Sequence, residues 1–165
     1  MTVDPEFQIH PATVADVPII LSLIKELADY ERLAHEVVAT EADLRKALFS
    51  PRPVAEALVG RFEGDPIALA LFFHSFSTFL GRPGIYLEDL YVRPAYRGRG
   101  FGRCLLAHLA GLAVERQCGR LEWSVLTWNE LAIKSYRRAE AIPMDDWTVY
   151  RLTGDALRRL ARESR

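Results

Sequence analysis

The sequence predicts one domain of the α/β (α+β) class, covering residues 1–165, in which helices flank a single mixed, mostly antiparallel sheet of about six to seven strands. The predicted elements run in the order strand, two helices, three strands, helix, strand, helix, strand, helix. Turns of only a few residues join the three consecutive strands, which favours antiparallel pairing between them. Half of the 165 residues are apolar and 26% are charged, so a chain of this length can bury a substantial core.

The first third of the chain predicts a strand and two helices. A strand is expected at Phe7–His10, before a proline. Apolar residues then recur at helical spacing, which predicts a helix over about 16–31. A second, shorter helix is expected through about Phe49, because Thr40 and Asp43 have the spacing of a capping box at its start.

The remainder predicts a three-stranded meander followed by alternating helices and strands. The strands of the meander are expected at Ala55–Arg61, Ile67–Phe76 and Ile85–Val92. Glycine and proline in the two intervening turns are typical strand breakers. The later elements are a helix at Gly102–Gln117, a strand at Leu121–Val125, a helix at Asn129–Arg138, a strand at Trp147–Leu152 and a helix at Asp155–Arg162.

Several classes of protein are disfavoured by the composition. The longest apolar run, Ile67–Phe73, is far shorter than the ~20 residues of a membrane-spanning helix, and the first ten residues lack the pattern of a signal peptide. Cys104 and Cys118 do not have the spacing of a disulfide framework, and the histidines show no metal-ligand spacing. We therefore expect a cytoplasmic protein with no metal ion and no membrane partner.

The net charge of −1 conceals an uneven distribution. Residues 1–66 carry 12 acidic and 6 basic residues, whereas residues 67–165 carry 10 acidic and 15 basic ones. The chain is not uniformly basic, so no nucleic-acid partner is expected. The acidic residues 1–66 are suited to a cationic partner, and the basic residues 67–165 to an anionic one.

The segment Arg97–Arg103, with the sequence Arg-Gly-Arg-Gly-Phe-Gly-Arg, lies between a predicted strand and a predicted helix. Glycines allow positive φ angles and a close approach of the backbone to a ligand. A helix start presents unpaired N–H groups and a partial positive charge, and both attract phosphate. Arg97, Arg99 and Arg103 add forked donors. The segment therefore predicts a phosphate site, with a plain glycine-rich connection as the simpler alternative.

Two common phosphate-binding motifs do not fit this segment. A P-loop requires Gly-x-x-x-x-Gly-Lys-Ser/Thr, and the segment contains no lysine. The dinucleotide-binding motif requires Gly-x-Gly-x-x-Gly, and Arg103 stands in place of its third glycine. Nucleotide hydrolysis and dinucleotide binding are therefore disfavoured.

The pattern Arg97-x-x-Gly100-x-Gly102 resembles the pyrophosphate-binding motif of the GNAT superfamily of acetyl-CoA-dependent N-acetyltransferases. Five further segments resemble the diamine (spermidine/spermine) acetyltransferase branch of that superfamily. In chain order these are Ile9–Thr13, Lys25–Glu31, Tyr86–Leu90, Trp128–Glu130 and Ser135–Arg138. The resemblance extends along nearly the whole chain and implies the GNAT fold.

The resemblance implies acetyl-CoA as co-substrate. The strand before the turn would pair its backbone with the pantetheine arm, and the turn itself would hold the pyrophosphate. Asn129 would lie beside the pantetheine arm, although it is equally suited to capping a helix. The implied acetyl-CoA-binding residues are Leu90, Tyr91, Val92, Arg97, Gly98, Arg99, Gly100, Phe101, Gly102, Arg103, Asn129 and Ala132.

The resemblance implies Tyr136 and Glu88 as the catalytic residues. Tyr136 would protonate the departing thiolate, which leaves more readily when a neutral O–H lies within hydrogen-bond reach. A lysine-like amine has a pKa of ~10.4, so under about a thousandth of it is neutral at pH 7. Glu88 would bind this amine and accept its proton, directly or through water. Asp89 is expected on the other face of the strand unless the strand bulges.

The resemblance also implies a substrate site. Tyr30 and Glu31 match family positions where a second carboxylate can hold the distal ammonium of a diamine. Glu122, Trp123 and Ser124 match substrate-side positions on the strand beside the cleft, where eukaryotic-type polyamine enzymes carry a histidine, an aromatic and an aliphatic residue.

The expected function is transfer of an acetyl group from acetyl-CoA to a primary amine of a small diamine, polyamine or lysine-like amine, by direct attack in a ternary complex. The sequence leaves open a protein lysine or an antibiotic amine as acceptor, and a non-catalytic acyl-CoA-binding module. The resemblance further implies a homodimer. It assigns no definite role to Trp147 or to His35.

Overall fold

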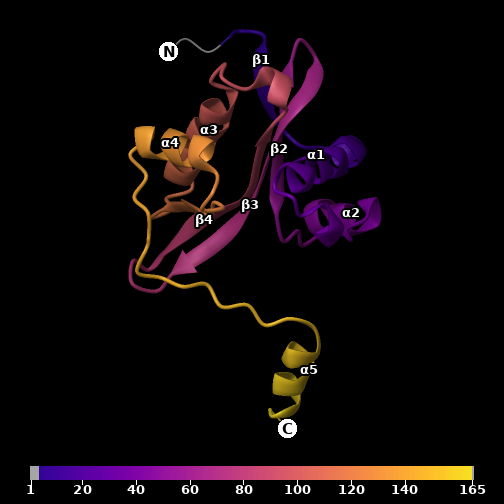
Figure 1. Cartoon of the computed structure of the whole chain (residues 1–165), viewed down its shortest axis with the longest axis vertical. Coiled ribbons are helices and arrows are strands. Elements are labelled where there is room, and N and C mark those ends of the chain that lie inside the picture. The colour runs from indigo at the N-terminus through magenta and orange to yellow at the C-terminus, as the bar shows by residue number, and fades with distance from the viewer. Residues whose placement is uncertain (1–3, 165) are drawn as a thin grey trace. The chain divides into compact units, whose positions relative to one another are not determined.

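The computed structural model of the chain describes residues 4–164, which fall into two compact units, the first ending at Asn129 and the second beginning at Glu130 (Figure 1). In the first unit, five strands form one sheet in the order β1-β2-β3-β4-β5. The strands are β1 (Phe7–Pro11), β2 (Glu56–Phe62), β3 (Asp65–Ser77), β4 (Arg82–Val92) and β5 (Leu121–Trp123). The helices of this unit are α1 (Val17–Tyr30), α2 (Glu41–Phe49) and α3 (Phe101–Glu115), with short 3₁₀ turns at Val14–Asp16, Ala34–Glu36 and Pro94–Tyr96.

The fold class and the mostly antiparallel character of the sheet are confirmed. The first four strands pair antiparallel, and β5 pairs parallel to β4. The strand count was wrong, because the sheet has five strands rather than six to seven. The predicted strand at Trp147–Leu152 is irregular chain in the structure. Its aromatic and β-branched residues favour a pleated, half-buried surface, but a strand forms only against a partner edge.

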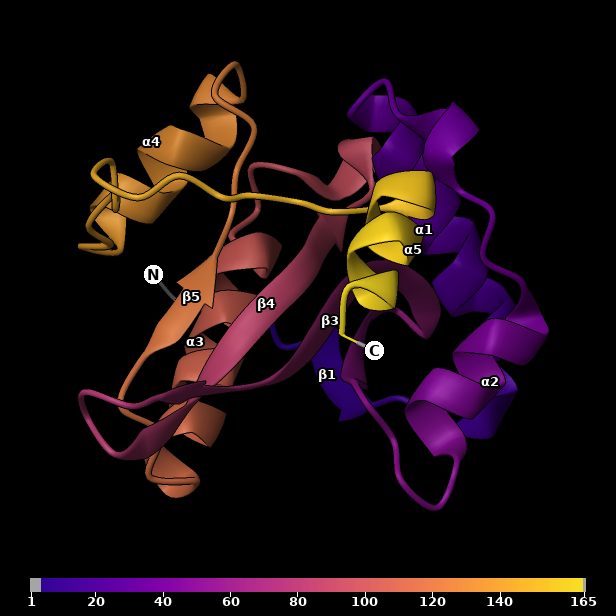
Figure 2. The ribbon, with the colours of Figure 1, turned by 90° about the horizontal axis from the view of Figure 1, so that it is seen from below.

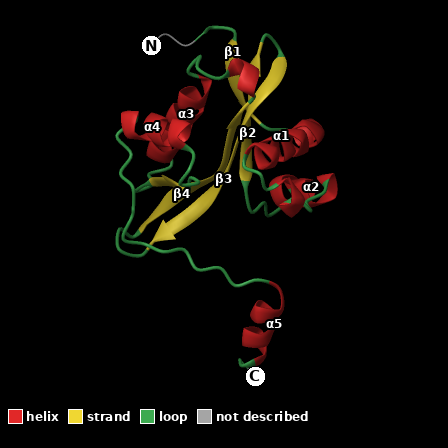
Figure 3. Ribbon diagram, in the orientation of Figure 1, coloured by secondary structure: helices red, strands yellow, loops and turns green. Residues whose placement is uncertain are grey.

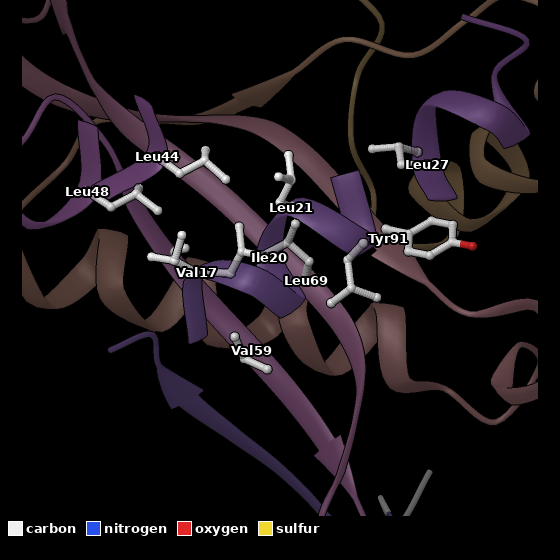
Figure 4. Packing of buried hydrophobic residues seen from close by; sticks show 11 residues of the cluster. Val17, Ile20, Leu21, Leu27, Leu44, Leu48, Val59, Leu69 and Tyr91 are labelled. Atoms are coloured by element: carbon white, nitrogen blue, oxygen red, sulfur yellow. The ribbon is translucent and has the colours of Figure 1, made fainter. Parts of the chain in front are cut away.

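Helices cover both faces of the sheet in the first unit (Figure 3). Ile20 and Leu23 of α1 belong to one buried cluster with Val59 of β2 and Leu69 of β3 (Figure 4). Side chains alternate between the two faces of a strand, so the neighbouring residues of β2 and β3 face α3. There the ring of Phe101, the first residue of α3, stacks on that of Phe7 at 4.2 Å between centroids. The first unit therefore has two cores with the sheet between them.

A β-bulge interrupts β4 where it pairs with β3. Leu71 lies opposite Asp89 and Phe72 lies opposite Leu87, so Glu88 is the extra residue. Adjacent residues of β3 face opposite sides of the sheet, and Leu87 and Asp89 therefore do so as well. The bulge places Asp89 on the face of the sheet that α1 covers.

Strand β4 pairs with β5 over only part of its length (Figure 2). The pairing begins at Ile85 opposite Leu121 and ends at Leu87 opposite Trp123. Beyond the bulge, the edge of β4 that faces away from β3 has no strand partner among the described residues. The sheet thus opens next to the turn that leads into α3.

The second unit contains two helices joined by irregular chain. Helix α4 spans Glu130–Arg138 and helix α5 spans Gly154–Arg162. At the end of α4, the carbonyl oxygen of Tyr136 accepts hydrogen bonds from the N–H groups of Ala139 and Ala141. Glu140 there has a φ of 62°, the left-handed conformation that usually favours glycine after a helix.

Candidate functional site

The turn between β4 and α3 depends on two glycines with positive φ. Gly98 has a φ of 78°, and Gly100, which caps α3, has a φ of 88°. A Cβ added at Gly98 would meet no atom within 4 Å, so its requirement for glycine is conformational rather than steric. The two glycines let the chain reverse over a few residues and enter the helix directly.

The start of α3 is a ready anion site. A helix leaves its first N–H groups without intrahelical partners, and Gly100 has no side chain with which to cap them. No acidic residue lies in the first turn of α3. The amides of Phe101, Gly102 and Arg103 therefore add to the positive end of the helix dipole. This chemistry suits a diphosphate group.

Arg97 holds the turn in place. Its Nε donates a hydrogen bond of 2.9 Å to the carbonyl oxygen of Val92, at the end of β4. Its guanidinium carbon lies 4.3 Å from the centroid of the Tyr30 ring and 5.5 Å from that of Tyr91. Arg97 thus links the turn to α1 and β4 by a charge-assisted hydrogen bond and by stacking.

Of the other two arginines in the turn, Arg99 is engaged and Arg103 is free. Arg99 forms an ion pair of 2.8 Å with Asp4 and lies 4.1 Å from the centroid of the Phe62 ring. Arg103 is exposed and has no ion pair or hydrogen-bond partner within residues 4–164. Arg103 is therefore the turn arginine whose guanidinium is available to an anion.

An ion pair between Arg93 and Glu26, which was not predicted from the sequence, also joins the turn to α1. Arg93 donates from Nε and Nη2 to the two carboxylate oxygens of Glu26, at 3.0 and 2.8 Å. It also donates from Nη1 to the carbonyl oxygen of Pro66. The hydrogen bonds from Arg93 lower the pKa of Glu26, and burial opposes this effect. A bidentate pair of this kind fixes both position and orientation.

Three carboxylates gather where the bulge of β4 faces the end of α1. Asp89 is partly buried, and its pKa is raised to about 6 by burial and then by the negative charges of Glu88 and Glu31. Burial also raises the pKa of Glu31. Glu88 itself is exposed. A cation that binds beside these groups lowers the electrostatic free energy of the site, because it stabilises the charged forms of the carboxylates.

Tyr30 connects this acidic group to the loop after β5. Its hydroxyl donates a hydrogen bond of 3.3 Å to the side-chain oxygen of Asn129. The centroid of the Tyr30 ring lies 5.9 Å from that of the Trp128 ring, and the guanidinium of Arg97 lies over the Tyr30 ring. Trp128 was not assigned a site role from the sequence, because a surface aromatic has no local signature of its own.

The open edge of β4 presents backbone groups beside the turn. The N–H of Arg93 bonds to Ile67 on β3, and hydrogen bonding alternates along an antiparallel strand. Leu90 and Val92 therefore direct their N–H and C=O groups to the open side, away from β3. Tyr91, between them, is buried in the cluster under α1 (Figure 4).

The strand expected at Leu121–Val125 ends at Trp123, so Glu122 and Trp123 lie on β5 and Ser124 follows it. All three have partners within the first unit. Glu122 forms an ion pair of 2.7 Å with Arg120. The hydroxyl groups of Ser124 and Tyr86 lie 2.7 Å apart. Trp123 pairs with Leu87 in the register of the sheet. These contacts order the strand beside the opening of the sheet.

The remaining expected site residues, Ala132 and Tyr136, lie in the second unit. Ala132 and Tyr136 are one turn apart on the same side of α4, and both are partly buried. His35 is exposed on the surface of the first unit, with its Nε2 3.4 Å from Oε1 of Glu36. Trp147 is also exposed. Within residues 4–164, no cluster of three or more histidine, cysteine or acidic side chains has the arrangement of a metal site. No helix in that range has the length and apolarity needed to cross a bilayer.

Residues 21–140 match the acetyltransferase (GNAT) family. The chain is 37% identical to thialysine N-epsilon-acetyltransferase of Bos taurus, over 93% of this chain and 96% of that protein. It is 33% identical to L-ornithine N5-acetyltransferase of Arabidopsis thaliana, over 93% of this chain and 87% of that protein. Among solved structures, an integron cassette protein from the mobile metagenome of V. cholerae superposes with a TM-score of 0.80 at 25% identity, covering 96% of this chain and 99% of that one.

Proposed function

The chain belongs to the acetyltransferase (GNAT) family and transfers an acetyl group from acetyl-CoA to a small amine, and we propose that this amine is a diamine, polyamine or lysine-like amine with a second positive charge. The relatives named for thialysine and ornithine support the proposal. Each of those two amino acids carries a primary amine at the end of its side chain and a second amino group.

The observation that carries the proposal is the group of Glu31, Glu88 and Asp89 at the end of α1. Like charges at short range raise the free energy of the empty site, and a bound ammonium relieves that cost. A substrate with two cationic centres can occupy the reacting position and this acidic group together. We assign Glu31 and Asp89 to the distal ammonium and Glu88 to the reacting amine.

The residues present fit acetyl-CoA. The free amides of the α3 start and the unpaired Arg103 suit its diphosphate, with Gly98 and Gly100 giving the turn its shape. The open edge of β4 offers the N–H and C=O groups of Leu90 and the N–H of Val92, which can pair with the amide groups of the pantetheine arm, whereas the Val92 carbonyl already accepts from Arg97. In this proposal the turn and β4 are held in position by Arg97, Arg99 and Tyr91. The pantetheine arm is contacted by Asn129 and Ala132.

The proposed reaction is direct attack of the amine on the thioester in a ternary complex. At pH 7 the amine arrives protonated, and removing its proton costs ~4.6 kcal/mol for a pKa of ~10.4. Glu88 accepts this proton, through a water molecule, from its exposed position on the bulge. Tyr136 donates its phenolic proton to the departing thiolate, so that no charge remains on sulfur, and the second proton that the nitrogen loses as the amide forms restores the phenol. Glu122, Trp123 and Ser124 shape the acceptor side of the site.

Two further features of the enzyme belong to the same proposal. We infer that it acts as a homodimer in the cytoplasm. Cys104 and Cys118 are free thiols, which suits a reducing compartment.

The test is steady-state acetyl transfer by the wild-type, Glu88→Gln and Tyr136→Phe enzymes, with products from a mixed pool of amines resolved by mass. We expect acetylated diamines and lysine-like amines, and a kcat that falls by about 100-fold in each variant, within the range of general acid–base contributions. Ser135→Ala, next to Tyr136, is the matched control. Products limited to protein lysines or aminoglycosides would contradict the acceptor, and an unchanged kcat in Tyr136→Phe at every pH would contradict its role.

A further inference from the structure

The turn after α1 holds Arg32 in a conformation that arginine rarely adopts. Arg32 has a φ of 62°, in the left-handed region where a side chain is strained and glycine is not. Strained residues of this kind are concentrated at binding and catalytic sites, where another requirement outweighs the strain. A function of the Arg32 side chain would account for an arginine at a position that suits glycine.

The guanidinium of Arg32 lies close to the acidic end of the site. Its central carbon is 5.9 Å from the centroid of the Trp128 ring, and that ring packs against Tyr30. Arg32 directly follows Glu31, which is near enough to Asp89 for their charges to interact. A cationic group is thus placed beside the carboxylates that the proposed function assigns to the distal ammonium.

The side chain of Arg32 has its hydrogen-bond donors available. It is exposed, and it takes part in no ion pair within residues 4–164. By contrast, Arg93 is paired with Glu26 and Arg97 donates to a carbonyl group. Stacking on Trp128 occupies one face of the guanidinium and leaves the N–H groups at its edge free. Such a group can bind a carboxylate through two parallel hydrogen bonds.

We propose that the acceptor is an α-amino acid with a primary amine at the end of its side chain, and that Arg32 binds its α-carboxylate. This inference rests on the proposed function and narrows its acceptor. Glu31 and Asp89 then receive the α-ammonium, and the side-chain amine lies at Glu88. An α-ammonium and an α-carboxylate are attached to one carbon atom, and they match two adjacent residues of opposite charge, Glu31 and Arg32.

Without a cation in this position, the site would repel an amino acid. Glu31, Glu88 and Asp89 attract ammonium groups, but they oppose a carboxylate brought to the same place, because like charges raise the electrostatic free energy. Arg32 supplies the opposite charge. A simple diamine has no group for Arg32 to bind, and its distal ammonium is repelled by the guanidinium. Arg32 should therefore favour an amino acid over the diamine of the same length.

The experiment compares kcat/KM for ornithine with kcat/KM for 1,4-diaminobutane, two acceptors that differ only in the α-carboxylate. We expect the wild-type enzyme to favour ornithine by about 10-fold and to acetylate its side-chain amine, which fragmentation of the product in a mass spectrometer identifies. In Arg32→Gln the preference should fall by about 100-fold, so that the diamine becomes the better acceptor. A loss of this size is within the range for hydrogen bonds to charged groups.

Arg52→Gln, at an exposed position of the loop before β2, is the matched control and should retain the wild-type preference. In Arg32→Gln the change should appear in the KM for ornithine, with kcat nearly unchanged, because the carboxylate is bound alike in the ground state and the transition state. The kcat/KM for 1,4-diaminobutane should not decrease. A merely structural role of Arg32 would instead lower kcat/KM for both acceptors equally.

Equal kcat/KM for the two acceptors in the wild type, or a preference that survives Arg32→Gln, would overturn this inference and leave the proposed function standing. Acetylation of the α-amine of ornithine would also overturn it, and acetylation of neither compound would contradict both proposals. Should Arg32→Gln fail to fold, Arg32→Gly takes its place, because glycine is not strained at a φ of 62°. It should show the same loss of preference, and a retained preference would contradict the carboxylate contact.

Discussion

The guanidinium of Arg97 lies over the ring of Tyr30, with 4.3 Å between its central carbon and the ring centroid. Arg97 follows β4 and Tyr30 ends α1, so this contact joins segments 67 residues apart in sequence. The same arginine donates to the carbonyl oxygen of Val92. Arg97 therefore positions the turn. The groups that remain available to bind an anion are the first amides of α3 and the guanidinium of Arg103.

We predict that Arg97→Lys weakens acetyl-CoA binding by about 10-fold, because lysine cannot stack on Tyr30 and donate to Val92 at the same time. Isothermal titration with acetyl-CoA measures this effect. Lys25→Arg, at an exposed position of α1, is the control and should leave the affinity unchanged. Full affinity in Arg97→Lys would show that the turn holds its shape without this contact.

Gly100→Ala and Gly111→Ala should change stability in opposite directions. Gly100 has a φ of 88°, so alanine there costs about 1 kcal/mol or more. Gly111 is an exposed interior residue of α3 with no atom near its added Cβ, so alanine should stabilise the protein by about 1 kcal/mol. Urea unfolding measures both changes. Equal effects at the two positions would contradict the assigned conformation of the turn.

The raised pKa of Asp89 should make the free energy of unfolding decline as the pH rises. Its pKa is about 6 in the folded protein, against the ordinary value of 3.8 expected for the unfolded chain, so between these values the folded state binds more protons than the unfolded state. The free energy of unfolding therefore decreases with rising pH across this window, by roughly 3 kcal/mol in total. Asp89→Asn should remove the decline, and urea unfolding at several pH values measures it.

The exposed carboxyl of Asp29 on α1 provides the matched control for this pH dependence. Asp29→Asn should retain the decline between pH ~4 and ~6. An Asp89→Asn variant with the same pH dependence as wild type would mean that Asp89 is not the buried carboxyl of this site.

Arg32→Gly should stabilise the end of α1. Arg32 has a φ of 62°, and the N–H groups of Arg32 and Leu33 bond back to the carbonyls of Asp29 and Ala28, which is a Schellman motif. Arg32→Ala loses the same side chain but retains the strained conformation. We expect the glycine variant to be more stable than the alanine variant by about 1 kcal/mol in thermal or urea unfolding, and the reverse order would contradict the motif.

Features that depend on short stretches of chain were predictable from the sequence. The capping box that begins α2 has Thr40 and Asp43 hydrogen-bonded as expected, and the turn from β4 into α3 has the two positive φ angles that its glycines suggested. Both are decided by residues a few positions apart, and local chemistry is sufficient for them.

Features that depend on register or on distant partners were not predictable. The bulge at Glu88 arises from how β3 aligns with β4, and it decides which face Asp89 occupies. The partners Glu26 for Arg93 and Tyr30 for Arg97 lie more than sixty residues away in sequence. The strand expected at Trp147–Leu152 was wrong for the single chain, because propensity cannot supply a partner edge.

The most direct test of the account compares kcat/KM for 1,4-diaminobutane with that for 1-aminobutane, in the wild-type enzyme and in Asp89→Asn. The two acceptors differ only in the second amine, which lies beside Glu31 and Asp89 in the proposed complex. We expect the wild type to favour the diamine by about 100-fold, and the preference to fall by about 10-fold in the variant. A wild-type preference near one, or a preference that survives Asp89→Asn unchanged, would contradict the assignment of these carboxylates to the acceptor.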